Sequence, residues 1–168
     1  MVAMLNKLND LYYWILHRTV DRYHVIKTGL EPGYHDKDYI LLHVAFNLLK
    51  DFVECELAWM NYITIPDDTP ENKTKISTYR YDYLMAEYLF CEFRAPELGL
   101  EYLDWEISLK GRSNASQRSM AREAKKLYLW WVVDRPARKE DYKLEEKYGE
   151  EDQKMFHRLI NIRSSLWT

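Results

Sequence analysis

The stretch DYILLHVAFNLLKDFVECELAWM, from Asp38 to Met60, is the longest strongly apolar run in the chain. With the exception of Glu56, its polar side chains recur every three or four residues and form one narrow stripe on a helix. The rest of the cylinder is apolar, and the alternation typical of a strand is missing. The stretch therefore predicts a helix buried on nearly all sides. Its charged residues exclude a membrane span.

Helical periodicity continues on both sides of this stretch. The chain has 168 residues, which is the size of one domain, and its five Gly and five Pro are too few for the many tight turns of an all-β protein. Further helices are expected over residues 2–20, 79–93, 96–109, 113–133 and 150–166. The sequence predicts an all-α single domain, 1–168, of five or six helices packed around 38–60.

Two segments lack periodicity and are expected to be loops. Residues 65–78 carry two prolines and the pair Asp67-Asp68, which predicts an exposed connection. Residues 135–149 are charged and aperiodic, and they are expected to form a second loop.

The two cysteines, Cys55 and Cys91, lie apart in apolar helical surroundings. Such isolated residues are typical of buried thiols in a reducing compartment. The N-terminus has no signal-peptide pattern, because Lys7 and Asp10 interrupt any apolar run. These features predict a cytoplasmic protein.

Charge is distributed unevenly along the chain. The net charge is −3, but residues 80–109 carry two Arg against seven Asp or Glu, and residues 110–139 carry nine Lys or Arg against two acids. One interpretation is that the two oppositely charged helices pair with each other. The other is that the basic segment binds an anion. A nucleic acid is not favoured, because the chain as a whole is acidic and has no known recognition motif.

The basic segment contains a candidate ligand site. Trp130 could stack on a planar ligand while Arg135 and Arg138 bind its phosphate, and Arg118 and Arg122 could extend the anion site along the preceding helix. The alternative is that the tryptophans belong to the core or lie half exposed, and that the arginines form a solvated helix end.

Two carboxylate pairs form a second candidate site. Asp51 and Glu54 lie one helical turn apart, as do Glu101 and Asp104, and two such pairs on facing helices could hold Mg²⁺ against a nucleoside triphosphate. The arrangement resembles that of the all-α nucleotide pyrophosphohydrolases. It departs from that family because the first pair begins with Asp where the family usually has Glu, and because the gap between the pairs is longer. The alternative for the first pair is a solvent-facing seam.

Three segments resemble uncharacterised proteins of tailed bacteriophages. They are TGLEPGYHDKD at 28–38, WWVVDRPAR at 130–138 and IRSSLWT at 162–168. The resemblance implies a phage protein made in the bacterial cytoplasm, but no activity that could be transferred to a residue here. Small phage proteins are often virion parts or inhibitors of host systems, and some inhibitors sequester a nucleotide.

These observations favour a binding protein over an enzyme. We expect a non-enzymatic, cytosolic and homo-oligomeric protein that captures a small anionic, nucleotide-like ligand or a host protein, without a cofactor. One alternative is a Mg²⁺-dependent nucleotide pyrophosphohydrolase that uses the two carboxylate pairs. The other is a structural component of the virion.

Overall fold

The computed structural model describes residues 28–88, 93–139 and 141–166. Helices account for nearly all regular structure there, and no strand occurs in these ranges. The elements are α2 (Lys37–Asp51), η1 (Phe52–Leu57), α3 (Ala58–Thr64), α4 (Pro70–Tyr88), α5 (Pro96–Ser108), α6 (Ala115–Leu129), η2 (Trp130–Asp134), η3 (Tyr142–Leu144), α7 (Glu145–Ile162) and η4 (Arg163–Ser165). The predicted all-α single domain is confirmed. The helix expected over 2–20 lies outside the described residues.

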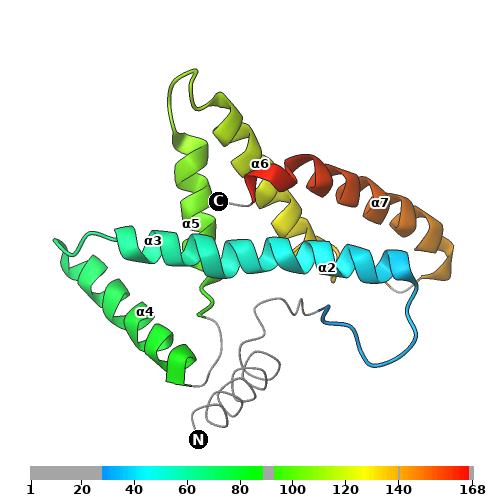
Figure 1. Cartoon of the computed structure of the whole chain (residues 1–168), viewed down its shortest axis with the longest axis horizontal. Coiled ribbons are helices and arrows are strands. Elements are labelled where there is room, and N and C mark those ends of the chain that lie inside the picture. Colours follow the sequence, from blue (N-terminus) through cyan, green and yellow to red (C-terminus); the bar gives the residue numbers. More distant parts are fainter. Residues whose placement is uncertain (1–27, 89–92, 140, 167–168) are drawn as a thin grey trace, which may run out of the picture.

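The predicted central helix is confirmed and is longer than expected. The elements α2, η1 and α3 follow one another without a break from Lys37 to Thr64. In Figure 1 this long helix crosses the molecule, with α5, α6 and α7 on one side and α4 on the other. Phe46, Leu49 and Val53 on it are fully buried. Burial of these side chains against α5, α6 and α7 holds the fold together.

The segment η1 is a π-helical turn inside the long helix, and α5 crosses it in backbone contact. A Cβ atom added at Gly99 of α5 would lie 1.9 Å from the carbonyl oxygen of Val53. The amide of Ala95 also donates a 2.8 Å hydrogen bond to the carbonyl of Glu54. Only glycine at position 99 permits this approach, so the close crossing requires glycine at this position.

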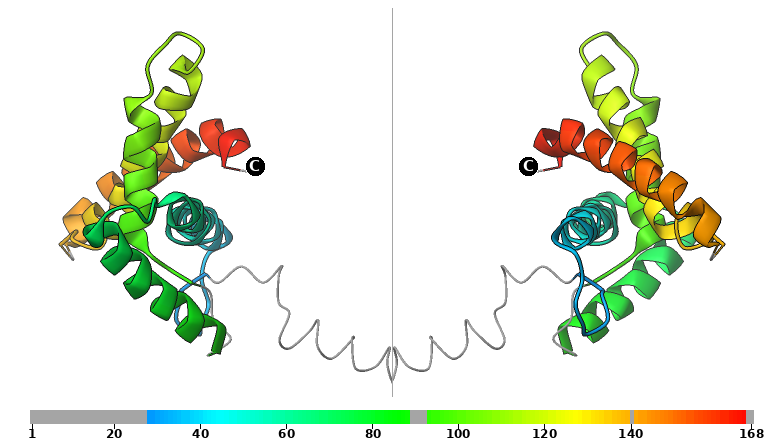
Figure 2. Two further views of the ribbon diagram at one scale, coloured as in Figure 1. Left: turned by 90° about the vertical axis from the view of Figure 1, so that its left-hand side faces the viewer. Right: turned by 90° about the vertical axis from the view of Figure 1, so that its right-hand side faces the viewer.

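Apolar side chains form two clusters along the long helix. The larger cluster lies where α2 and η1 meet α5, α6 and α7. The smaller one contains Ala58, Ala86, Phe93 and Leu98, and Tyr79 and Tyr83 of α4 pack against it. Figure 2 shows the same division from the side, with α4 apart from the α5–α6–α7 side of the long helix.

The loop prediction for 65–78 was wrong for most of its length. Only residues 65–69 are non-helical, and α4 begins at Pro70. Proline suits a first helical position, and the Thr69 hydroxyl accepts a 3.2 Å hydrogen bond from the amide of Asn72, which caps the helix. The sequence Thr69-Pro70-Glu71 is therefore a helix start rather than a turn.

The loop prediction for 135–149 was wrong in its second half. A short turn, η3, is followed by α7 from Glu145, so the helix expected from residue 150 begins five residues earlier. Glu145 and Glu146 lie in its first turn, where the helix dipole favours acidic side chains. Gly149 lies inside the helix and does not end it.

The oppositely charged segments pair with each other, as one of the two interpretations predicted. The ammonium of Lys125 on α6 lies 2.6 Å from the Asp104 carboxylate on α5, and Gln117 donates a 2.8 Å hydrogen bond to Glu106. Figure 1 shows α5 and α6 as a hairpin. In the described part of the chain, no helix has the length and apolar character needed to span a membrane.

Candidate ligand-binding site

The segment that contains Trp130 forms a second π-helical turn, η2, at the end of α6. The amide of Arg135 donates a 2.8 Å hydrogen bond to the carbonyl of Trp130, five residues back. Trp130 and Trp131 are 3% and 8% exposed, and the Phe46 ring stacks on Trp131 at 4.9 Å between centroids. Both indoles thus belong to the core, which is the alternative that the sequence left open.

Arg135 and Arg138 lie beside these indoles and bind carboxylates of α7. Asp152 accepts a 3.0 Å hydrogen bond from Nη2 of Arg135 and a 2.7 Å hydrogen bond from Nη1 of Arg138. The Nη2 atom of Arg138 lies 3.0 Å from the Glu151 carboxylate. The structure therefore brings Trp130, Arg135 and Arg138 together, but around the protein's own acids.

Each guanidinium group also lies over aromatic rings. The Arg135 group is 4.7 Å from the Trp131 centroid, and the Arg138 group is 5.3 Å from that of Trp130. Burial works against the charge of Arg135, but the hydrogen bond to Asp152, the negative charge of that carboxylate and the contact with Tyr39 together outweigh this effect and raise the pKa of Arg135. The arrangement is that of an internal ion-pair network on an aromatic surface.

The other two predicted anion ligands lie elsewhere. Arg118 donates hydrogen bonds of 2.9 Å and 2.7 Å to the carbonyls of Leu109 and Gly111, so it closes the turn between α5 and α6. It precedes Arg135 by 17 residues along helical structure, which corresponds to about 25 Å. Arg122 is exposed on α6, about one turn after Arg118. The structure does not bring these two residues into the cluster at η2.

The four carboxylates proposed as magnesium ligands are each paired with basic groups. Asp51 and Glu54 share Arg94, at 2.5 Å and 3.1 Å. Glu101 binds Lys75 at 2.6 Å, and the Asp104 carboxylate is paired with a lysine of α6. Within the ranges that the structure describes, no three His, Cys, Asp or Glu side chains form a group that could hold a metal ion. The two pairs are not brought together as one site.

Glu54 lies at the centre of a buried polar network. It is 6% exposed, and its carboxylate accepts a 2.9 Å hydrogen bond from the Tyr128 hydroxyl in addition to the Arg94 contact. Burial and the hydrogen bond to Glu54 raise the pKa of Tyr128. Burial opposes the charge of Arg94, but the hydrogen bonds to Asp51 and Glu54 and the negative charge beside the guanidinium group together outweigh this effect and raise its pKa. The network joins η1 to α6 and to the segment before α5.

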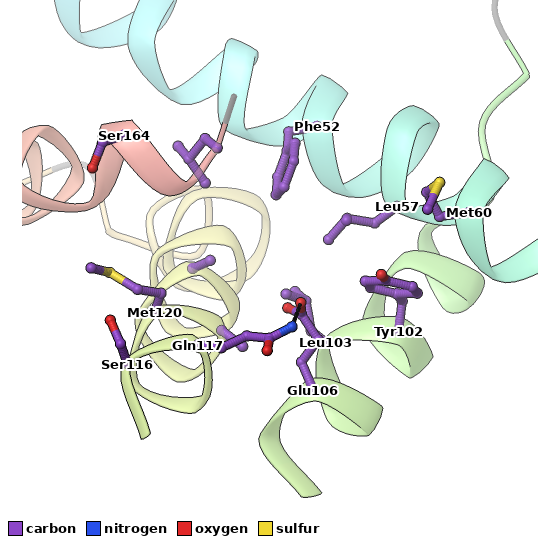
Figure 3. A pocket seen from close by; sticks show the side chains of 13 residues that line it. Phe52, Leu57, Met60, Tyr102, Leu103, Glu106, Ser116, Gln117, Met120 and Ser164 are labelled. Atoms are coloured by element: carbon purple, nitrogen blue, oxygen red, sulfur yellow. Dashed lines mark hydrogen bonds between the residues drawn. The ribbon is translucent and has the colours of Figure 1, made fainter. Parts of the chain in front are cut away.

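A cavity opens between η1, α5, α6 and the C-terminal turn. Its volume is about 460 Å³. Figure 3 shows Phe52 and Leu57 pointing from the long helix towards Leu103 of α5. The wall on α6 includes the small side chains of Ala121 and Ala124. The cavity exists because these two alanines leave space opposite the large side chains of η1.

The rim of this cavity carries polar groups. Glu106 accepts the hydrogen bond from Gln117 described above, and Tyr102 lies next to it on α5 (Figure 3). Burial and the negative charge of Glu106 raise the pKa of Tyr102 above its ordinary value. Met60 and Ser116 complete the rim. The site offers an apolar interior with a carboxylate acceptor at its edge.

Sequence reasoning missed this cavity. The sequence predicts an apolar face on each of these helices, but nothing in the pattern shows that two such faces leave space between them. The only available signal was the pair Ala121 and Ala124 on a helix that otherwise buries large side chains.

Comparisons with protein-family models, with curated proteins and with solved structures found no match for this chain.

Proposed function

We propose that this protein is a non-enzymatic binding protein that holds a small, largely apolar ligand in the cavity between η1, α5 and α6. The cavity itself carries the proposal. Its volume of about 460 Å³ falls within the range of about 300–1,000 Å³ that is usual for small-molecule sites. An apolar interior with a few polar groups at one edge is also the usual composition of such sites.

The rim determines the chemistry of the ligand. The second oxygen of Glu106 can accept a hydrogen bond from a ligand, and its negative charge repels an anionic head group. The Tyr102 hydroxyl supplies a further polar contact. We therefore propose a ligand with an apolar body and a neutral or cationic head that donates a hydrogen bond.

The charge pairing supports binding rather than catalysis. A general acid, a general base or a metal ligand must reach the substrate, whereas Asp51, Glu54 and Asp152 are held by arginines.

The Mg²⁺-dependent hydrolase stays a prediction. So does an anionic ligand at Arg135 and Arg138, which would have to displace the Asp152 carboxylate. The phage context, the cytoplasmic location and a virion role stay predictions as well.

A fluorescence titration with Nile red, a neutral apolar dye, tests the proposal. The wild-type protein should bind one dye per chain with micromolar affinity. Ala121→Leu fills the cavity and should weaken binding by at least about tenfold. Ala115→Leu adds the same side chain at an exposed position of the same helix and should leave the affinity unchanged.

Circular dichroism on both variants establishes that they fold. Equal Nile red affinity for folded Ala121→Leu and the wild-type protein would place the dye elsewhere and contradict the proposal.

A further inference from the structure

Helix α4 has apolar side chains on two opposite faces. Its inner face packs Tyr79, Tyr83 and Ala86 against the smaller apolar cluster, and the Tyr83 ring stacks on Trp59 at 5.0 Å between centroids. Tyr81 follows Tyr79 by two residues and therefore lies about 200° around the helix, on the outer face. A helix that is apolar on both sides is typical of one that is covered on both sides.

The outer face carries Tyr81, Leu84 and Met85, which are 64%, 52% and 36% exposed. Their spacing of three and four residues places them in one stripe. Figure 1 shows α4 at the edge of the fold, and the exposure of these three side chains shows that the stripe is open to solvent. An exposed apolar stripe on a helix at the edge of a domain is typical of a helix–helix interface.

The charges beside the stripe indicate what covers it. Arg80 and Glu87 are both exposed and are seven residues apart, so they lie on the same flank of α4, about 10 Å from each other. An antiparallel second copy of α4, related by a two-fold axis beside Leu84, places Arg80 of one copy opposite Glu87 of the other. The same contact then occurs twice, as two-fold symmetry requires.

We propose that two copies of this chain associate through α4, antiparallel, with Leu84 near the two-fold axis and reciprocal Arg80–Glu87 ion pairs between the copies. Tyr81 and Met85 of each copy cover the apolar side chains of the other. The proposal gives the expected homo-oligomer a defined interface, and it is independent of ligand binding in the cavity.

Sedimentation velocity on the full chain tests this interface over a concentration range of about 1–100 µM. The wild-type protein should be dimeric at the upper end. Arg80→Glu places two carboxylates opposite each other, and Glu87→Arg places two guanidinium groups opposite each other. Each single reversal should weaken the dimer at least about tenfold. The double variant Arg80→Glu/Glu87→Arg restores opposite charges and should recover the wild-type dimerisation constant within about threefold.

Two further variants distinguish this specific interface from nonspecific hydrophobic association. Leu84→Lys puts a charge in the centre of the stripe and should give a monomer. Val133→Lys places the same charge at an equally exposed apolar residue outside α4, and it should leave the dimer intact. A wild-type protein that stays monomeric over the whole range would overturn the proposal. So would a dimer that both single reversals leave unchanged, or a double variant that remains monomeric.

Discussion

The described part of the chain contains two polar networks beside π-helical turns, and they differ in how their charges balance. At η1, two carboxylates share one arginine, and the central carboxylate of Glu54 is 6% exposed. At η2, two arginines face two carboxylates and lie on indole rings. Both occur where π-helical turns interrupt the long helices, a position at which functional groups often gather. Their pairing shows that such a position can hold ion pairs that join the helices of the fold.

The two networks also differ in how their surroundings hold them. The network at η1 depends on a backbone contact and on the Arg94 cation that its two carboxylates share. The network at η2 has two cations, two anions and aromatic faces, so the loss of one member leaves others in place. We therefore expect substitutions in the region at η1 to lower the free energy of unfolding strongly, and substitutions in the region at η2 to lower it less.

The largest expected difference concerns two glycines. Gly99→Ala forces a Cβ atom to within 1.9 Å of the Val53 carbonyl oxygen, and we expect a loss of about 3 kcal/mol or more in the free energy of unfolding. Gly149→Ala, in α7 near the η2 network, has open space around the new methyl group and should gain about 0.5–1 kcal/mol. Urea denaturation measures both. Similar values for the two variants would show that α5 does not cross η1 as closely as described.

The second difference concerns the ion pairs themselves. Arg94→Met leaves the buried carboxylate of Glu54 without its cation, and we expect it to cost about 3 kcal/mol. Asp152→Asn should cost less, about 1–2 kcal/mol, because Arg138 keeps Glu151 and both guanidinium groups keep their aromatic contacts. Denaturation at neutral pH gives both values. If Asp152→Asn costs more than Arg94→Met, the contrast between the two networks is wrong.

The smallest expected effect is a pH dependence that belongs to the η2 side. Burial, and secondly the positive charge of Arg135, lowers the pKa of His43, whose ring lies 4.9 Å from that of Trp131. The unfolded chain therefore binds a proton more readily than the folded one. The contribution of neutral His43 to the free energy of unfolding should be complete above the ordinary histidine pKa of about 6.5. It should decrease as the pH falls through the lowered pKa that His43 has in the folded protein.

The variant His43→Gln should remove the decrease just below pH 6.5. The hydrogen bond from Arg158 lowers the pKa of Glu123, so the contribution of this carboxylate is lost only as the pH falls below the ordinary glutamate value. Denaturation midpoints of the wild type and His43→Gln between about pH 5 and pH 7 measure the effect. Parallel curves for the two proteins would assign the pH dependence to another group.

The sequence was sufficient for the fold class and for the central helix, because the periodicity of 38–60 is strong and burial follows from it. It was less reliable at Pro70 and Glu145, where helix-start signals were interpreted as loops. The sequence did not predict which charged residues pair with each other. Arg94 and Glu54 are 40 positions apart, and Arg135 and Asp152 are 17 apart, so their pairing depends on how the helices cross. The cavity was invisible for the same reason, since it is the space left between Phe52 and Ala124.

The central claim is that both polar networks stabilise the fold and that the cavity beside η1 binds the ligand. A methyl NMR titration with Nile red tests it most directly. The account predicts that the dye shifts the methyl resonances of Leu57, Leu103 and Ala121, which line the cavity, and leaves those of Val133 and Ala137 beside the η2 network unchanged. Shifts at Val133 and Ala137 without shifts at the cavity methyls would contradict this claim. They would indicate that the ligand binds beside Arg135 and Arg138 at η2.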